Sequence, residues 1–146
     1  MSKSNAFENS LLQLLFNNVD IANIGDAGGL QNSATAGSLY LALHTGDPGE
    51  VGDQTTSECA YGSYARIAVA RTVGGWTVAT NTATNAALAQ FPECTSGSET
   101  ITYVSIGLAA SGASVIMYSG ALTASRSVSS GIQPQFAINA LVVTED

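Results

Sequence analysis

The sequence has few charged side chains and very few basic ones. Only 10% of its 146 residues are charged, against about 25% in an ordinary globular domain. Four lysines and arginines stand against eleven acidic residues, which gives a formal net charge of −7. Nucleic-acid binding requires clustered basic side chains that neutralise phosphates. The composition therefore argues against nucleic acid as a partner.

A long apolar run is also absent. The longest candidate, Leu11 to Phe16, is far shorter than the roughly 18 residues that a membrane span needs. Lys3 is followed neither by a long apolar core nor by a small-residue cleavage site, so no signal peptide is predicted. We therefore expect a chain that is made in a cytoplasm, functions without processing and has no membrane partner.

Histidine and cysteine are scarce, which limits the available chemistry. His44 is the only histidine, and Cys59 and Cys94 are the only cysteines. Two cysteines do not make a disulfide framework, and we expect two separate thiols. Structural zinc sites use cysteine and histidine in pairs, and one histidine leaves no second for acid–base work. A set of Cys59 or Cys94 with His44 and Asp47 lacks a nucleophile motif, so we assign no catalytic residue and expect no enzymatic activity.

An acidic turn follows the histidine. Asp47, Glu50 and Asp53 lie in the segment DPGEVGD, whose carboxylates and free carbonyls are the ligands that calcium prefers. The spacing does not match an EF-hand. The same segment suits an ordinary turn in which Asp47 caps the turn, Pro48 fixes φ and Gly49 takes a positive φ. We prefer the turn and assign no metal or cofactor, with calcium as the alternative.

One segment has the pattern of an α-helix. Apolar side chains recur at helical spacing within residues 4–18, among them Phe7, Leu11 and Leu15. Asn5 followed by Glu8 matches a capping box. The apolar stripe is wider than a solvated helix would carry. We therefore expect the helix to pack on its own sheet or on a neighbouring subunit.

The remainder has the pattern of a β protein. Residues 20–37 contain four glycines and are predicted to be a linker. Short strands with Gly- and Ser-containing turns follow, predicted at 39–44, 64–71, 76–78, 86–91, 101–108, 115–118, 121–127 and 135–143. This spacing predicts an antiparallel β-sandwich or jelly roll of about eight strands over 38–146, within a single domain of residues 1–146.

Two of the four basic residues belong to one predicted strand. Arg66 and Arg71 lie five positions apart, so their side chains should leave opposite faces of that strand. We expect them to pair with carboxylates of the acidic loop or with a neighbouring subunit. An inward-facing arginine would require a bidentate partner.

Segments spread over nearly the whole chain occur in a distinctive order and spacing. They are FENSLLQLLF at 7–16, LYLALHTGDPGEVG at 39–52, GSYARIAVAR at 62–71, AQFPE at 89–93, TYVSIGLAASG at 102–112 and YSGALTASRSVSSGIQPQFAINALVV at 118–143. Together they resemble a family of small virion proteins of tailed bacteriophages, labelled tail-fibre-like or head-decoration proteins. The resemblance implies a β-sandwich structural protein of the virion with no enzyme activity.

Two functions follow from this resemblance. The leading hypothesis is a capsid decoration or cement protein that binds the outer capsid lattice, with the major capsid protein as partner. The alternative is a tail or tail-fibre component that contacts the host surface. We also expect a homo-oligomer. The predicted contact residues are Phe7, Leu11 and Leu15 on the helix and Asp47, Glu50 and Asp53 in the loop of residues 47–58.

Overall fold

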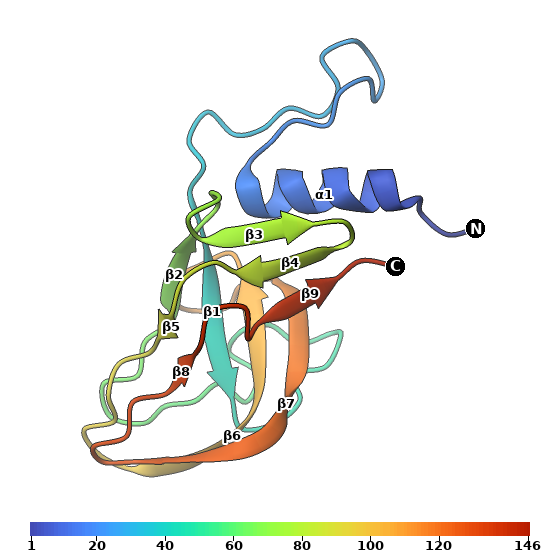
Figure 1. The fold of residues 1–146 in the computed structure, drawn as a ribbon. Coiled ribbons are helices and arrows are strands. Elements are labelled where there is room, and N and C mark those ends of the chain that lie inside the picture. Colours follow the sequence, from blue (N-terminus) through green and yellow to red (C-terminus); the bar gives the residue numbers. More distant parts are fainter. The chain divides into compact units, whose positions relative to one another are not determined.

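A computed structural model describes all of residues 1–146 and shows a mainly β protein with one helix and nine strands in three antiparallel sheets (Figure 1). The elements are α1 (Asn5–Asn17), β1 (Ser38–His44), β2 (Ile67–Ala70), β3 (Trp76–Ala79), β4 (Thr82–Asn85), β5 (Ala89–Gln90), β6 (Ser98–Gly107), β7 (Ile116–Ser129), β8 (Gln135–Phe136) and β9 (Val142–Thr144). The predicted fold class is confirmed, and the strands are consistent with a β-sandwich. The helix is too short to cross a membrane.

The chain forms two compact units, each assembled from segments that are distant in sequence. Unit 1 consists of Met1–Ser38, Val69–Leu88 and Phe136–Asp146, and unit 2 consists of Leu39–Ala68 and Ala89–Gln135. Both termini belong to unit 1, where Lys3 Nζ lies 3.2 Å from Glu145 Oε2. That residues 1–146 form a single domain stays a prediction.

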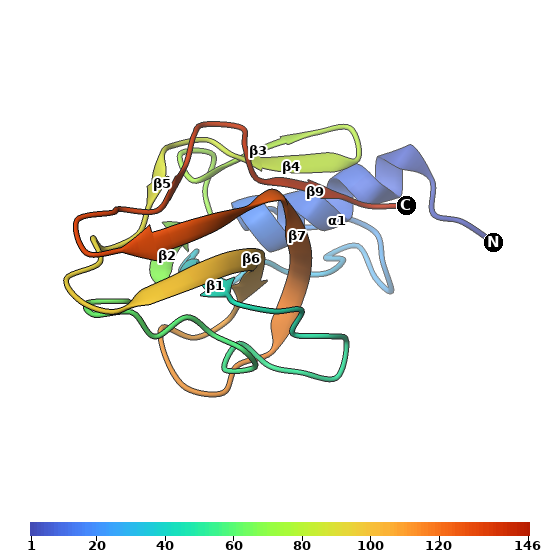
Figure 2. The same ribbon diagram turned by 90° about the horizontal axis from the view of Figure 1, so that it is seen from below.

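In unit 1, α1 packs along the hairpin formed by β3 and β4 (Figures 1 and 2). The buried stripe of the helix is Glu8, Leu12 and Phe16, spaced four residues apart. The ring of Phe16 meets the fully buried ring of Trp76 edge-on, with centroids 4.7 Å apart. Burying each such side chain stabilises the fold by about 1.5–3 kcal/mol. This contact therefore forms the centre of the unit 1 core.

The predicted capping box is wrong by one residue. Ser4 is the N-cap, and its side chain accepts a hydrogen bond from the backbone N–H of Phe7. A capping box on Ser4 would need Glu or Gln at position 7, whereas Glu8 belongs to the buried stripe. The helix ends at Asn18, which takes a left-handed conformation with φ 56° and donates its N–H to Gln13 O.

Arg71 also binds the C-terminal end of the helix. Its Nε donates to Leu15 O at 2.7 Å and its Nη2 to Leu14 O at 2.7 Å, while Nη1 donates to Ala36 O at 3.1 Å. The prediction that Arg71 pairs with a carboxylate is therefore wrong. A guanidinium carries several N–H groups in one plane, and the last carbonyls of a helix have no partner within the helix. The cation also lies at the negative end of the helix dipole.

The sequence did not predict β4, the second strand of the β3–β4 hairpin. β4 pairs with β3 in the register Trp76↔Asn85 and Ala79↔Thr82, and the strand predicted at 86–91 is present only as the two residues of β5. The turn between them contains Thr80 with φ 53°, a left-handed conformation that a threonine in the sequence does not predict. β9 then pairs with β4 and completes this sheet.

The larger sheet has the strand order β2-β1-β6-β7. β6 and β7 lie side by side over much of their length (Figure 2). The predicted strands at 115–118 and 121–127 are in fact one strand of 14 residues. It continues through Gly120 because this residue pairs with Val104 of β6, and extra residues are accommodated where the register shifts, opposite Ile101 to Tyr103 and opposite Ile106 to Gly107.

Aromatic side chains fill the core of unit 2. The rings of Tyr64 and Phe91 are stacked with centroids 6.4 Å apart, and Tyr61 meets Tyr64 edge-on at 5.2 Å. Tyr61 is buried, and its hydroxyl donates to Pro92 O at 3.1 Å. These tyrosines are therefore core residues with satisfied hydroxyl groups.

We predict that Arg71→Lys lowers the free energy of unfolding by about 1–3 kcal/mol, because one ammonium cannot reproduce three hydrogen bonds in one plane. Urea denaturation of the purified protein measures the change. Arg126→Lys is the matched control, since Arg126 is exposed on β7. Equal denaturation midpoints for Arg71→Lys and the wild type would show that the hydrogen bonds of Arg71 contribute nothing to the free energy of unfolding.

Candidate functional site

The loop of residues 45–58 lies against one face of the sheet of unit 2. Alternation along β1 puts Tyr40, Ala42 and His44 on that face, opposite Gly107, Ser105 and Tyr103 of β6. The side chain of Gln54 in the loop contacts this face, where its Nε2 donates to Tyr40 O at 2.9 Å.

The contact between this loop and the sheet requires glycine at position 107. A Cβ atom there would lie 2.1 Å from Cδ of Gln54, whose side chain is completely buried. No other residue leaves room for the Gln54 amide to reach the strand. Gly107 therefore has a packing role that its place near the end of a predicted strand does not reveal.

His44 links the same loop to β6. Its Nδ1 lies 2.8 Å from Thr56 O and its Nε2 lies 2.7 Å from Ser105 Oγ. A carbonyl oxygen only accepts, so Nδ1 carries the hydrogen and Nε2 accepts from the Ser105 hydroxyl in the neutral ring. The ring is fully buried, and this burial lowers the pKa of His44 below its ordinary 6.5.

Arg66 is the centre of the polar cluster beneath the loop. Its Nε and Nη2 donate to the two oxygens of Glu58 at 2.7 and 2.8 Å, which makes the pair bidentate. The Arg66 side chain is 1% exposed, and the hydrogen bond with Glu58 raises its pKa further. The prediction that Arg66 pairs with a carboxylate of the acidic loop is confirmed.

The remaining N–H groups of Arg66 bind a second residue of the loop and one further segment, the residues after β6. Nη1 donates to Gln54 Oε1 at 3.2 Å and to Ala109 O at 3.0 Å, and Nη2 also donates to Gly112 O at 2.8 Å. All five N–H groups of the guanidinium thus have an acceptor. One side chain therefore fixes the 45–58 loop, the segment after β6 and the start of β2 relative to one another.

The cluster continues through Tyr64 to the backbone of β1. The Tyr64 hydroxyl donates to Glu58 Oε1 at 3.0 Å and accepts from the N–H of Leu43 at 3.0 Å. Gln54 Nε2 lies 3.3 Å from Ser105 Oγ, which joins this part of the cluster to His44. Every polar side chain in the set has its partners inside the protein, so the arrangement holds a loop in place.

The two cysteines are free and buried, which confirms the prediction of separate thiols. Burial and the nearby Glu99 raise the pKa of Cys59 to about 12. A thiol with that pKa is protonated at neutral pH, and thiols react as nucleophiles through their thiolate form. Cys59 therefore has the properties of a structural cysteine.

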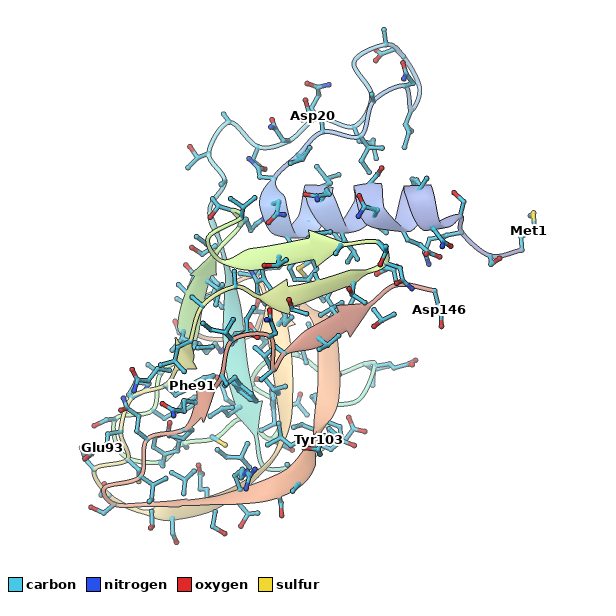
Figure 3. All side chains as sticks on the ribbon, viewed as in Figure 1. Met1, Asp20, Phe91, Glu93, Tyr103 and Asp146 are labelled. Atoms are coloured by element: carbon cyan, nitrogen blue, oxygen red, sulfur yellow. The ribbon has the colours of Figure 1, made fainter.

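The acidic turn has the conformation that its sequence predicts. The N–H of Gly49 donates to Asp47 Oδ1 at 2.9 Å, and Gly49 has φ 67°. Hydrogen bonds from the side chain and the backbone N–H of Thr55 lower the pKa of the Asp53 carboxyl group. The nearby Asp47 carboxylate raises the pKa of Tyr103, which is labelled in Figure 3. The described residues contain no group of three or more His, Cys, Asp or Glu side chains that could hold a metal ion.

The two predicted sets of contact residues lie in different units. Phe7 is 38% exposed on α1, and Leu11 and Leu15 are partly exposed next to the buried stripe. Asp47 and Glu50 are exposed in the 45–58 loop, and Asp53 is half-buried. Their role in contacts stays a prediction.

The sequence did not predict the polar side chains that hold the 45–58 loop against the sheet. Glu58, Gln54 and Ser105 carry no motif, and Ser105 is 61 residues from His44. The one usable signal was Arg66 itself, because a basic residue is rare in this chain and needs a carboxylate partner if it points inward.

Comparison with known proteins defines the class of this chain. A family model described as Podophage GP4 fiber I protein gp80 matches residues 2–144. Because the match covers nearly the whole sequence, the chain belongs to this family of bacteriophage structural proteins. No curated protein matches the chain. The resemblance inferred from the order of sequence segments is confirmed at this level.

We predict that Glu58→Gln destabilises the protein by about 3 kcal/mol, because it leaves the buried Arg66 charge without its counter-ion. The same change should speed cleavage after the exposed Glu50 by a glutamate-specific protease, since the loop loses its anchor. Glu93→Gln, at an exposed position labelled in Figure 3, is the control. Unchanged cleavage in Glu58→Gln would show that the ion pair does not hold the loop.

We further predict that stability decreases as pH falls below about 6.5, the ordinary pKa of histidine. The unfolded chain then binds a proton at position 44 that the folded protein, with its lowered pKa, does not bind. By linkage the free energy of unfolding falls by up to about 1.4 kcal/mol per pH unit until the folded ring also titrates.

Urea titrations between pH 7.5 and about 5 measure this slope. His44→Gln should abolish it in that range, because the chain has no other histidine. A slope that persists unchanged in His44→Gln would assign the effect to other groups.

Proposed function

We propose that the protein is a non-enzymatic subunit of a bacteriophage fibre and is located in the virion. The observation that carries this proposal is the family match over residues 2–144, whose description names a fibre protein. The chain is small, so it would act as one module in a larger assembly. The host bacterium would make it in its cytoplasm before assembly.

The chemistry of unit 2 supports a role in contacts. The only histidine and the buried arginine are both engaged in holding the 45–58 loop, and the neighbouring thiol of Cys59 has a strongly raised pKa. A loop that presents a contact surface binds more tightly when it is ordered beforehand, because less conformational entropy is lost on binding. The polar cluster supplies this order.

The exposed part of the loop indicates the chemistry of its partner. Asp47 and Glu50 are exposed, and Val51 between them and Asp53 is fully exposed. An acidic rim around an apolar tip is complementary to a basic surface with a small apolar depression. Such a surface would belong to another virion protein or to the host cell.

The second candidate is a capsid decoration protein whose partner is the major capsid protein. The acidic loop and the net charge of −7 favour it, because both suit docking on a basic lattice. The chain also has neither a shaft repeat nor a coiled-coil heptad pattern. A small terminal or adaptor module of a fibre needs neither feature, and the description of the matched family supports the fibre proposal.

We expect a few to a few dozen copies of the protein per virion, measured by quantitative mass spectrometry against the major capsid protein. Antibody labelling of the same particles should mark the fibres. Hundreds of copies with label spread over the capsid would replace the fibre proposal with the decoration hypothesis. Absence of the protein from purified virions would refute both.

A further inference from the structure

His44 holds the 45–58 loop through its ring, and the two hydrogen bonds of that ring depend on its protonation state. The ring is fully buried between Thr56 O of the loop and Ser105 Oγ of β6, at 2.8 and 2.7 Å. In the neutral ring Nδ1 donates and Nε2 accepts, so each nitrogen matches its partner, whereas an imidazolium donates from both nitrogens. The bond with Ser105 is therefore the one that a second proton changes.

A proton on Nε2 leaves the Ser105 hydroxyl without an acceptor. The partners of Ser105 Oγ are the His44 ring and Nε2 of Gln54, which lies 3.3 Å away and only donates. If both of these nitrogens donate to the oxygen, the hydroxyl hydrogen loses its acceptor, and Ser105 is completely buried. An unpaired buried donor destabilises the arrangement in which it occurs. Protonation of His44 therefore disfavours the closed position of the loop.

The charges around the ring also disfavour an imidazolium in the closed loop. Glu58 favours a cation at His44, and Arg66 disfavours it. The Glu58 carboxylate is already bound by two N–H groups of Arg66 and by the Tyr64 hydroxyl. Tyr103, which pairs with His44 on β6, has a raised pKa, as has Tyr64, so both phenols are neutral. One carboxylate would therefore have to balance two cations in a buried cluster.

We propose that His44 is an acid-sensitive switch whose protonation releases the 45–58 loop while the sheet beneath it stays folded. His44 is the last residue of β1, and its partner Thr56 belongs to the loop. The loop can therefore leave the ring while the strands β1 and β6 remain paired along the rest of β1. At neutral pH release is rare, because it also separates Glu58 from Arg66.

The direction of the pH dependence follows from the two surroundings of the ring. In the closed loop burial lowers the pKa of His44, whereas in the released loop the ring meets water and titrates near the ordinary pKa of 6.5. Below pH 6.5 the released loop takes up the proton first, so acid favours release. The inference rests on the proposed function in one respect, which is that the loop serves as a contact surface. Acid would then remove the order that favours binding.

Native-state hydrogen exchange of the full-length chain at pH 7.5 and 5 tests the proposal. The N–H groups of Thr45 and Gln54 donate to Ser57 O and Ser114 O and report release of the loop. They should be less protected than the β1–β6 ladder and should exchange through an opening that low urea concentrations do not promote, because a local opening exposes little surface. After correction for intrinsic exchange, this opening should be up to about 30-fold more populated at pH 5.

His44→Gln removes the titrating ring, so its loop opening should be equally populated at both pH values. Glu93→Gln, at an exposed position, is the matched control and should keep the increase of the wild type. Circular dichroism verifies that each variant is folded. The wild type alone overturns the proposal if the loop amides have the same protection and urea dependence as the β1–β6 ladder, or if their opening does not change with pH. An undiminished increase in His44→Gln also overturns it. None of these results bears on the copy number per virion, which tests the fibre proposal separately.

Discussion

The buried pair of Arg66 and Glu58 is the interaction on which the arrangement of unit 2 depends. Removing a guanidinium from water costs several kcal/mol, and this cost is offset only because each of its five N–H groups finds an acceptor. Those acceptors belong to two separate segments, the 45–58 loop and the segment after β6. The electrostatic requirement of one side chain therefore determines where the 45–58 loop and the segment after β6 lie.

An arginine also joins distant segments of the chain in unit 1. Arg71 uses its planar donors on backbone carbonyls of α1 and of the segment before β1, so a second arginine joins parts of the chain that are far apart in sequence. In a chain with four basic residues, two hold segments together.

The two units expose different side chains. The 45–58 loop of unit 2 carries exposed carboxylates and is held by the polar cluster around Arg66. In unit 1, α1 and the loop of residues 19–33 expose apolar side chains, among them Phe7, Val19 and Leu30, beside the exposed carboxylates of Asp20 and Asp26. Exposed carboxylates favour partners of opposite charge.

The sequence by itself determined the fold class, the helix and the turn at Asp47-Pro48-Gly49, because period-2 alternation, spacing of four and turn chemistry are local properties. It also limited the chemistry through its single histidine. Only the tertiary structure decided the partners of Arg66, His44 and Arg71, the continuity of β7 through Gly120 and the position of β4. These depend on groups brought together from distant segments, where hydrogen-bond geometry and packing select a partner that no local pattern encodes.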